Sequence, residues 1–238
     1  MSLPKVNDWP AFRRHLKLLS DTFPEAFGGW VLIGGGACWF YRTTLERWAD
    51  TDFPVPAFSP AEDSVWLSKD IDFMGLTVQA GEALLAAPFK AESHTISFQG
   101  IEVDFLEEGV QLTAREAARN ARQVRTPEVI FRVADAGDLF AEKLAVLRRK
   151  ERPQDRLHLR VLETFLKCEF CREAESPDVL DADEWIERAR TVKTADLEFF
   201  QNDARLATRL GTAIRQLQAR EHRALKHWAR HHLPGYTD

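Results

Sequence analysis

The sequence predicts an α+β protein, with a mixed sheet and flanking helices followed by a helical C-terminal half. Two observations carry this prediction. Short apolar runs typical of strands are confined to the first part of the chain, and the later part has the 3.6-residue apolar spacing of helices. We therefore predict an α+β domain over residues 1–134 and a helical region over 135–238 packed on it. A chain of 238 residues with 45% hydrophobic content can bury a sizeable core.

The first half of the chain alternates helices and strands. Turn residues such as glycine and proline separate the apolar runs, which gives each element its limits. The expected order is a helix over 11–23, a strand over 30–33, a helix over 37–48 after three glycines, a proline-rich loop over 49–64, a strand over 69–74 and a helix over 78–87. Two runs at 94–98 and 101–107, split by Gln99 and Gly100, then predict a hairpin or a consecutive strand pair, and 128–133 predicts a further strand.

The second half is predicted to be helical throughout. Asp135 can cap a helix over 136–150, and Arg152 and Pro153 interrupt the pattern before the next one begins. Further helices are expected over 154–170, 183–190 and 195–232.

Composition and charge restrict the class of protein. A net charge of −5 and a pI of about 5.9 argue against nonspecific coating of nucleic acid, although a local basic patch remains compatible with them. No apolar run reaches membrane-spanning length and the N-terminus lacks a signal-peptide core, so we expect a cytoplasmic protein without membrane association. The C-x-x-C formed by Cys168 and Cys171 has no second half-site, which favours helix packing over a zinc site.

One of three Asp-x-Asp patterns stands in a predicted strand. The pairs at positions 50 and 52 and at 181 and 183 are interpreted as solvated loop charges and as charges at a helix start. Asp70 and Asp72 instead alternate with Ile71 and Phe73, so both carboxylates point to one face of the strand. Two like charges on one face are unfavourable unless a cation or a positive partner lies between them.

A third acid and a glycine turn extend this pattern. Asp104 lies between Val103 and Phe105 in a later strand, and three carboxylates on neighbouring strands could hold one or two Mg²⁺ ions. The glycines at 34 to 36 join a strand to a helix, where backbone N–H groups can face phosphates, although tight packing explains such turns at least as often.

The motifs "IGGGACWF", "SKDIDF" and "IEVDFLE" together resemble the DNA polymerase beta nucleotidyltransferase superfamily. The continuation "DLFAEKLAVLRRKERPQDRLHL" is similar to the AbiEii-type (type IV toxin) nucleotidyltransferases and related bacterial proteins. The resemblance covers roughly residues 28–165. It implies a nucleotidyltransferase fold that moves NMP from an NTP donor to a hydroxyl with Mg²⁺ or Mn²⁺, and a role as the toxin of a toxin–antitoxin pair with an antitoxin protein as partner.

The resemblance also implies roles for individual residues. Asp70 and Asp72 would bind metal, and Asp104 would be the third metal-binding carboxylate, activating the acceptor hydroxyl. The triphosphate would be lined by Gly34, Gly35 and Gly36. Lys143 would contact the nucleotide phosphates and Asp155 would be a late catalytic acid. From the residues alone, Lys143 could equally be a helix-surface lysine paired with nearby acids.

The sequence departs from the family pattern in two places. The stretch between Gly36 and Asp70 is longer than usual in the family, which predicts an insertion over the site. His158 stands where relatives repeat an acid three residues after the first, so Asp155 lacks its usual neighbour.

The last predicted helix is the part of the sequence that indicates the kind of acceptor. Residues 201–232 carry seven Arg and Lys against two acids, which favours RNA such as tRNA as acceptor through phosphate contacts, while a solvated helix face explains the same charges. One alternative is a small hydroxylated acceptor of the antibiotic type. The other alternative is that the chain is a noncatalytic protein that binds a nucleotide, RNA or a protein partner.

Overall fold

The computed structural model describes residues 9–48, 70–75, 89–90, 95–150, 152–174, 208, 211, 215, 223–232 and 235–237. The chain divides into two compact units. The first comprises Met1–Ala49 and Val55–Leu162, and the second comprises Asp50–Pro54 and Glu163–Asp238. The sequence placed its boundary after residue 134, whereas the first unit continues to residue 162. The helix after the sheet and the start of the next one therefore belong to the same unit as the strands.

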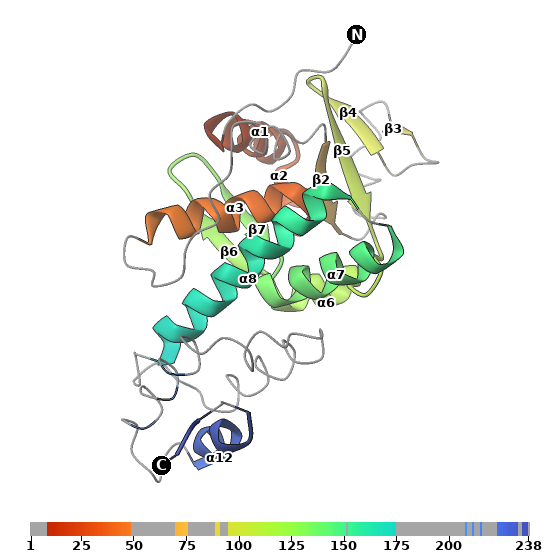
Figure 1. Ribbon diagram of the computed structural model, residues 1–238. Helices are drawn as coiled ribbons and strands as arrows, with labels where there is room; N and C mark the ends of the chain where they lie inside the picture. The colour runs from red at the N-terminus through yellow and green to blue at the C-terminus, as the bar shows by residue number, and fades with distance from the viewer. Residues whose placement is uncertain are drawn as a thin grey trace. The chain divides into compact units, whose positions relative to one another are not determined.

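The first unit is built on one mixed sheet of seven strands in the order β3-β4-β5-β2-β1-β7-β6 (Figure 1). Strand β1 pairs antiparallel with β2 and parallel with β7, and β2 pairs parallel with β5. The predicted α+β class with a mixed sheet is confirmed. The strands are β1 (Val31–Leu32), β2 (Asp70–Met74), β3 (Phe89–Lys90), β4 (Thr95–Phe98), β5 (Ile101–Leu106), β6 (Arg122–Arg125) and β7 (Ile130–Val133).

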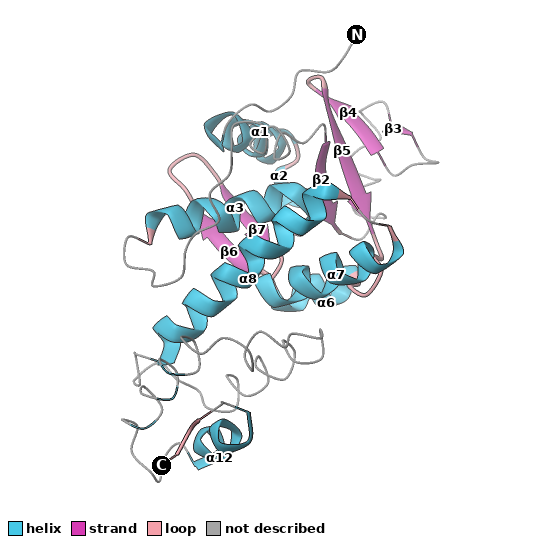
Figure 2. Cartoon of the chain, viewed as in Figure 1, coloured by secondary structure: helices cyan, strands magenta, loops and turns pink. Residues whose placement is uncertain are grey.

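Helices flank this sheet, as the colouring by secondary structure in Figure 2 shows. In the first unit the helices are α1 (Trp9–Thr22), α2 (Pro24–Phe27), α3 (Gly34–Arg47), α6 (Ala114–Asn120), α7 (Ala136–Arg149) and the start of α8 (Pro153–Ala174). The second unit contains α12 (Arg223–His232). Asp135 caps α7 by accepting a hydrogen bond from the backbone N–H of Gly137, as its position predicted. Helix α8 starts in the first unit and continues into the second.

Aromatic side chains form the core on one face of β2 and β5. Trp30 packs against Phe73 and Phe105, with ring centroids 5.4 and 4.7 Å away, and Phe27 contacts Phe73 from α2. Phe73 and Phe105 alternate with the acids of their strands and are almost fully buried. Because strand side chains alternate between faces, burying the aromatic rings on this face commits the intervening carboxylates to the other one.

Local sequence signals account for some elements and miss others. The hairpin between β4 and β5 turns through Gln99 and Gly100, both with positive φ, as a tight hairpin turn requires. Helix α6, with its capping box at Thr113, and strand β6 were not predicted. Both are short, so neither develops a full apolar period. The predicted loop over 49–64 and the predicted helices over 78–87 and 183–190 lie outside the described residues, as does most of the predicted helix before α12.

In the second unit, the described residues of α12 carry Arg223, Lys226 and Arg230 and no acid. Tyr236 is buried and lies against Gly211 and the guanidinium of Arg215. Cys168 is buried in α8, as expected for a residue that packs. Throughout the described part of the chain, no helix has both the length and the apolarity needed to cross a membrane.

Candidate functional site

Three carboxylates converge on one face of β2 and β5. The two strands are parallel, and their register makes Asp72 the direct partner of Asp104 and Asp70 the partner of Glu102. One ligand oxygen each of Asp70, Asp72 and Asp104 lies within 4.8 Å of the others. Strand alternation therefore brings together the three acids that the sequence predicted would meet.

Two of the three carboxylates have a raised pKa, chiefly because of burial. Burial, followed by the charge of Asp70, raises the pKa of Asp72 to about 7. Burial also raises the pKa of Asp104, although the hydroxyl of Thr95, which donates to Asp104 Oδ1, opposes this shift. Both shifts mean that negative charge is held here at a cost in free energy that a bound cation would relieve. Carboxylate oxygens at this spacing match the ligands that Mg²⁺ and Mn²⁺ prefer.

Gly34 fits closely against the Asp72 carboxylate. Its φ is +63°, in the left-handed region, and a Cβ built on it would lie 2.0 Å from Asp72 Oδ2. No other residue can therefore occupy position 34 without moving the carboxylate. A backbone hydrogen bond also joins the end of β1 to β2, because the Ile33 N–H donates to the Asp72 carbonyl at 3.0 Å.

The other two glycines of the run face different surroundings. A Cβ on Gly35 would meet only the ring of His158, at an ordinary contact distance of 3.6 Å. A Cβ on Gly36 would lie 2.5 Å from Phe12 of α1, so Gly36 is required for helix packing. Gly34 and Gly35 line the cavity described below, whereas Gly36 does not. All three residues form the first turn of α3 instead of preceding it.

A buried ion network stands across the cavity from the acids. Asp155 has no exposed surface, and its carboxylate accepts from Lys143 Nζ at 3.1 Å and from Arg152 Nε at 2.7 Å. Burial raises the pKa of Asp155, but Lys143 and Arg152 more than offset this and hold it below its ordinary value. Lys143 is itself 8% exposed, so it is not a helix-surface lysine. Two cations share one carboxylate, which leaves the network with a net positive charge.

His158 lies beside this ion network, and its ring is neutral. The residue is 3% exposed, its Nδ1 lies 3.9 Å from Asp155 Oδ1, and the edge of its ring faces Gly35. Burial, with Lys143 adding to it, lowers the pKa of His158 to about 3, so the imidazole is uncharged at neutral pH. A neutral histidine at this position preserves the net positive charge of the network formed by Lys143, Arg152 and Asp155. A second acid at the same position would cancel it.

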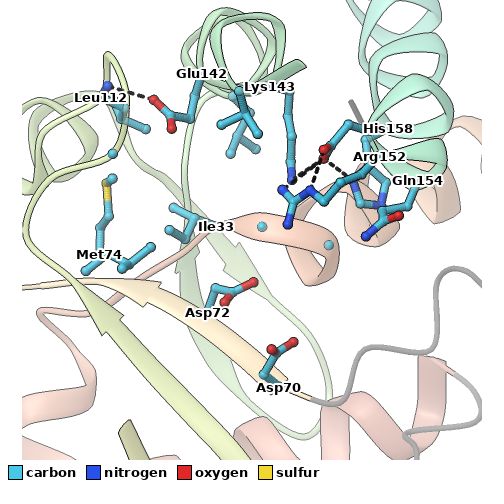
Figure 3. A pocket seen from close by; sticks show the side chains of 17 residues that line it. Ile33, Asp70, Asp72, Met74, Leu112, Glu142, Lys143, Arg152, Gln154 and His158 are labelled. Carbon is cyan, nitrogen blue, oxygen red and sulfur yellow. Dashed lines mark hydrogen bonds and ion pairs between the residues drawn. The ribbon is translucent and has the colours of Figure 1, made fainter. Parts of the chain in front are cut away.

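A cavity of about 460 Å³ joins these groups (Figure 3). In Figure 3 the carboxylates of Asp70 and Asp72 face the space below Lys143 and Arg152. The volume of the cavity lies within the range of small-ligand sites. The cavity is lined by Ile33, Gly34, Gly35, Asp70, Asp72, Met74, Leu106, Gly109, Leu112, Leu139, Glu142, Lys143, Val146, Arg152, Gln154, Asp155 and His158. Asp104 does not line it, and reaches the acid cluster from the neighbouring strand.

Two residues of the wall were not assigned a role from the sequence. Arg152 was interpreted only as an interruption between helices, although its spacing of three from Asp155 at the start of α8 is a readable signal for an ion pair. Glu142 accepts hydrogen bonds from the backbone N–H groups of Val110, Gln111 and Leu112. No local pattern announces a contact between residues thirty positions apart.

The sequence matches no known protein-family model, and no curated protein is significantly similar to it. The motif resemblance therefore stays a prediction, and the case for a function rests on the geometry of the site.

Proposed function

We propose that this chain is a divalent-metal-dependent nucleotidyltransferase that moves NMP from an NTP to a hydroxyl acceptor. The observation that carries the proposal is the clustering of Asp70, Asp72 and Asp104 within 4.8 Å, with two of the three acids lining a cavity that also holds Lys143 and Arg152. Acids alone would suit any cation, and cations alone would suit any anion. Both together suit a metal-bound triphosphate.

The acid cluster fits a divalent cation by its chemistry as well as its spacing. Its donors are all carboxylate oxygens, and burial together with the charge of Asp70 raises the pKa of Asp72, so a bound cation would favour the charged form of Asp72. When bound, Mg²⁺ or Mn²⁺ at Asp70, Asp72 and Asp104 would neutralise charge on the transferring phosphoryl group and on the leaving pyrophosphate.

The chain's own residues would position the donor. Gly34 and Gly35 line the cavity without side chains, and the first turn of α3 presents backbone N–H groups at its N-terminus. Lys143 and Arg152, held in place by Asp155, would neutralise the β- and γ-phosphates. Asp104, which has a raised pKa and does not line the cavity, would take the proton of the acceptor hydroxyl.

RNA is the acceptor that the described residues favour. Helix α12 carries three cations and no acid over ten residues in a chain of net charge −5. Such a helix can contact phosphates without regard to sequence. The toxin role stays a prediction from the motif resemblance.

The test is incubation of the full chain with each of the four α-³²P-labelled NTPs, Mg²⁺ and total RNA. We expect label in RNA with at least one nucleotide, and a loss of about 10³-fold or more in the Asp70→Asn, Asp72→Asn double variant. The control is Asp21→Asn, an exposed aspartate of α1 that pairs only with Lys17 in the described structure. Equal labelling by the wild type and the double variant would exclude the proposed chemistry.

A further inference from the structure

The cavity has two chemically different ends. The ionic end holds the acids, Lys143, Arg152 and His158, whereas Ile33, Met74 and Leu112 form the apolar end in Figure 3. The other apolar side chains that line the cavity are Leu106, Leu139 and Val146. Figure 3 shows this separation, with Met74, Ile33 and Leu112 on one side of the view and Arg152, Gln154 and His158 on the other. A ligand that fills the cavity must therefore be anionic at one end and apolar at the other.

One face of α7 spans both ends. Leu139, Glu142, Lys143 and Val146 follow the i, i+3, i+4, i+7 spacing of a single helix face, and all four line the cavity. Lys143 contacts the ion network and Glu142 contacts the turn over residues 109–112, whereas Leu139 and Val146 lie one turn to either side of this pair. One rigid helix therefore contributes charged and apolar side chains to the same cavity.

The outer wall of the apolar end is a turn fixed by Glu142. Its carboxylate accepts from the N–H groups of Val110, Gln111 and Leu112 at 2.8, 2.7 and 3.0 Å. Gly109 closes the turn by donating to the Leu112 carbonyl at 2.7 Å, and a Cβ on Gly109 would lie 2.7 Å from the Glu142 carboxylate. Both oxygens of Glu142 are therefore engaged, and the carboxylate acts as part of the wall.

We propose that the apolar end of this cavity is the nucleobase subsite of the donor, and that it selects nucleotides by fit instead of by hydrogen bonds to the base edge. This inference rests on the proposed function. A nucleoside triphosphate is itself anionic at one end and carries a flat, largely apolar base at the other, so one molecule satisfies both ends of one continuous cavity. An acceptor hydroxyl, in contrast, would not need an apolar end that is continuous with the ionic end.

The second part of the inference follows from the side chains present. Among the described residues that line the apolar end, Glu142 is the one polar side chain, and it is occupied by the turn. Pockets that discriminate through apolar contact achieve about 10- to 200-fold selectivity, against about 10⁴-fold or more for pockets that hydrogen-bond the distinguishing group. We therefore expect the four NTPs to differ by no more than about 100-fold in affinity.

The experiment compares the binding of two probes by calorimetry, ATP and inorganic tripolyphosphate, each with Mg²⁺ and the full chain. Leu112 is buried and lies on the same side of the cavity as Met74 in Figure 3, so Leu112→Trp can fill the apolar end. This variant should weaken ATP binding about 10-fold or more and leave tripolyphosphate binding within about 2-fold. Leu18→Trp, at an exposed position of α1 outside the cavity, is the matched control and should change neither.

Each alternative outcome is decisive. A second variant, Leu112→Ser, tests the same end without added bulk, and retained tripolyphosphate binding shows that either variant is folded. The inference is overturned, with the proposed function intact, if both variants bind ATP as the wild type does, or if they bind it but fail only in transfer, which would place the acceptor at the apolar end. Four NTPs that differ by about 10⁴-fold would overturn selection by fit. A wild type that binds neither probe would contradict the proposed function as well.

Discussion

His158 gives the site a neutral polar group where charge would be costly. The ring is buried beside Lys143 and Asp155, and its pKa is lowered to about 3 from an ordinary value of 6.5. Between those two pH values the unfolded chain binds a proton that the folded chain does not, so the free energy of unfolding falls as pH drops through this window.

We expect His158→Gln to reduce that loss. The variant keeps a polar side chain but cannot titrate, so its free energy of unfolding should fall less than the wild type's between pH 6.5 and 4, by roughly 1 to 3 kcal/mol. Urea denaturation at several pH values measures this. Leu18→Gln, at an exposed position of α1 that carries no titratable group, is the control and should keep the wild-type pH dependence. An equal fall in the free energy of unfolding between pH 6.5 and 4 in His158→Gln and the wild type would contradict the burial described for this ring.

Gly34 and Gly35 are adjacent but differ in what a methyl group would meet. In Gly34→Ala the new Cβ would collide with the Asp72 carboxylate at 2.0 Å on a backbone with positive φ, whereas in Gly35→Ala it would meet His158 at 3.6 Å. We expect Gly34→Ala to destabilise the chain by about 1 to 3 kcal/mol and to weaken Mn²⁺ binding, while Gly35→Ala preserves both. Thermal denaturation and Mn²⁺ titration test the pair. Equal behaviour of the two variants would refute the contact between Gly34 and Asp72.

Sequence reasoning worked best where a strand's alternation decides the outcome. Asp70, Asp72 and Asp104 could be predicted to converge because the period of two is strict once Phe73 and Phe105 are buried. It worked less well for Gly36, whose neighbour Phe12 comes from another helix, and for Lys143, whose burial depends on how α8 packs. Contacts of this kind depend on tertiary packing, which no local pattern encodes.

At the scale of elements, α7 organises the cavity. It carries Lys143 toward the ion network and Glu142 toward the turn over residues 109–112. This arrangement was not predicted, although the helix and its Asp135 cap were. A carboxylate that accepts three backbone N–H groups from another segment fixes that segment more firmly than a single contact would.

We expect Glu142→Gln to loosen the turn over residues 109–112. The amide replaces one acceptor oxygen with a donor that faces backbone N–H groups, so the free energy of unfolding should fall by about 1 to 3 kcal/mol. Hydrogen exchange at Val110, Gln111 and Leu112 should accelerate by about 10-fold or more. Glu46→Gln, which removes an exposed pair with Arg42 on α3, is the control. Unchanged exchange at the three amides would contradict a structural role for Glu142.

At the scale of the whole molecule, an acidic protein carries a basic helix. Arg223, Lys226 and Arg230 lie within the ten residues of α12, in the second compact unit. If these cations bind RNA phosphates, affinity must fall steeply with salt, since binding releases counterions from the nucleic acid.

The double variant Lys226→Ala, Arg230→Ala should therefore reduce the salt dependence of RNA binding. For single-stranded RNA the slope of log K against log salt should become shallower by about 1.4. Arg125→Ala, an exposed position of the edge strand β6, is the matched control. Filter binding at a series of KCl concentrations measures the slopes. A double variant with the wild-type slope would point to an acceptor other than RNA at this helix.

The proposed function requires that the acid cluster of β2 and β5 acts as one cation site. Titration with Mn²⁺, followed by the electron paramagnetic resonance signal of the free ion, tests this most directly. The wild type should bind Mn²⁺, and Asp72→Asn should weaken that binding about 100-fold while Asp21→Asn leaves it unchanged. A wild type that takes up no Mn²⁺, or an Asp72→Asn variant that binds it equally well, would contradict the account.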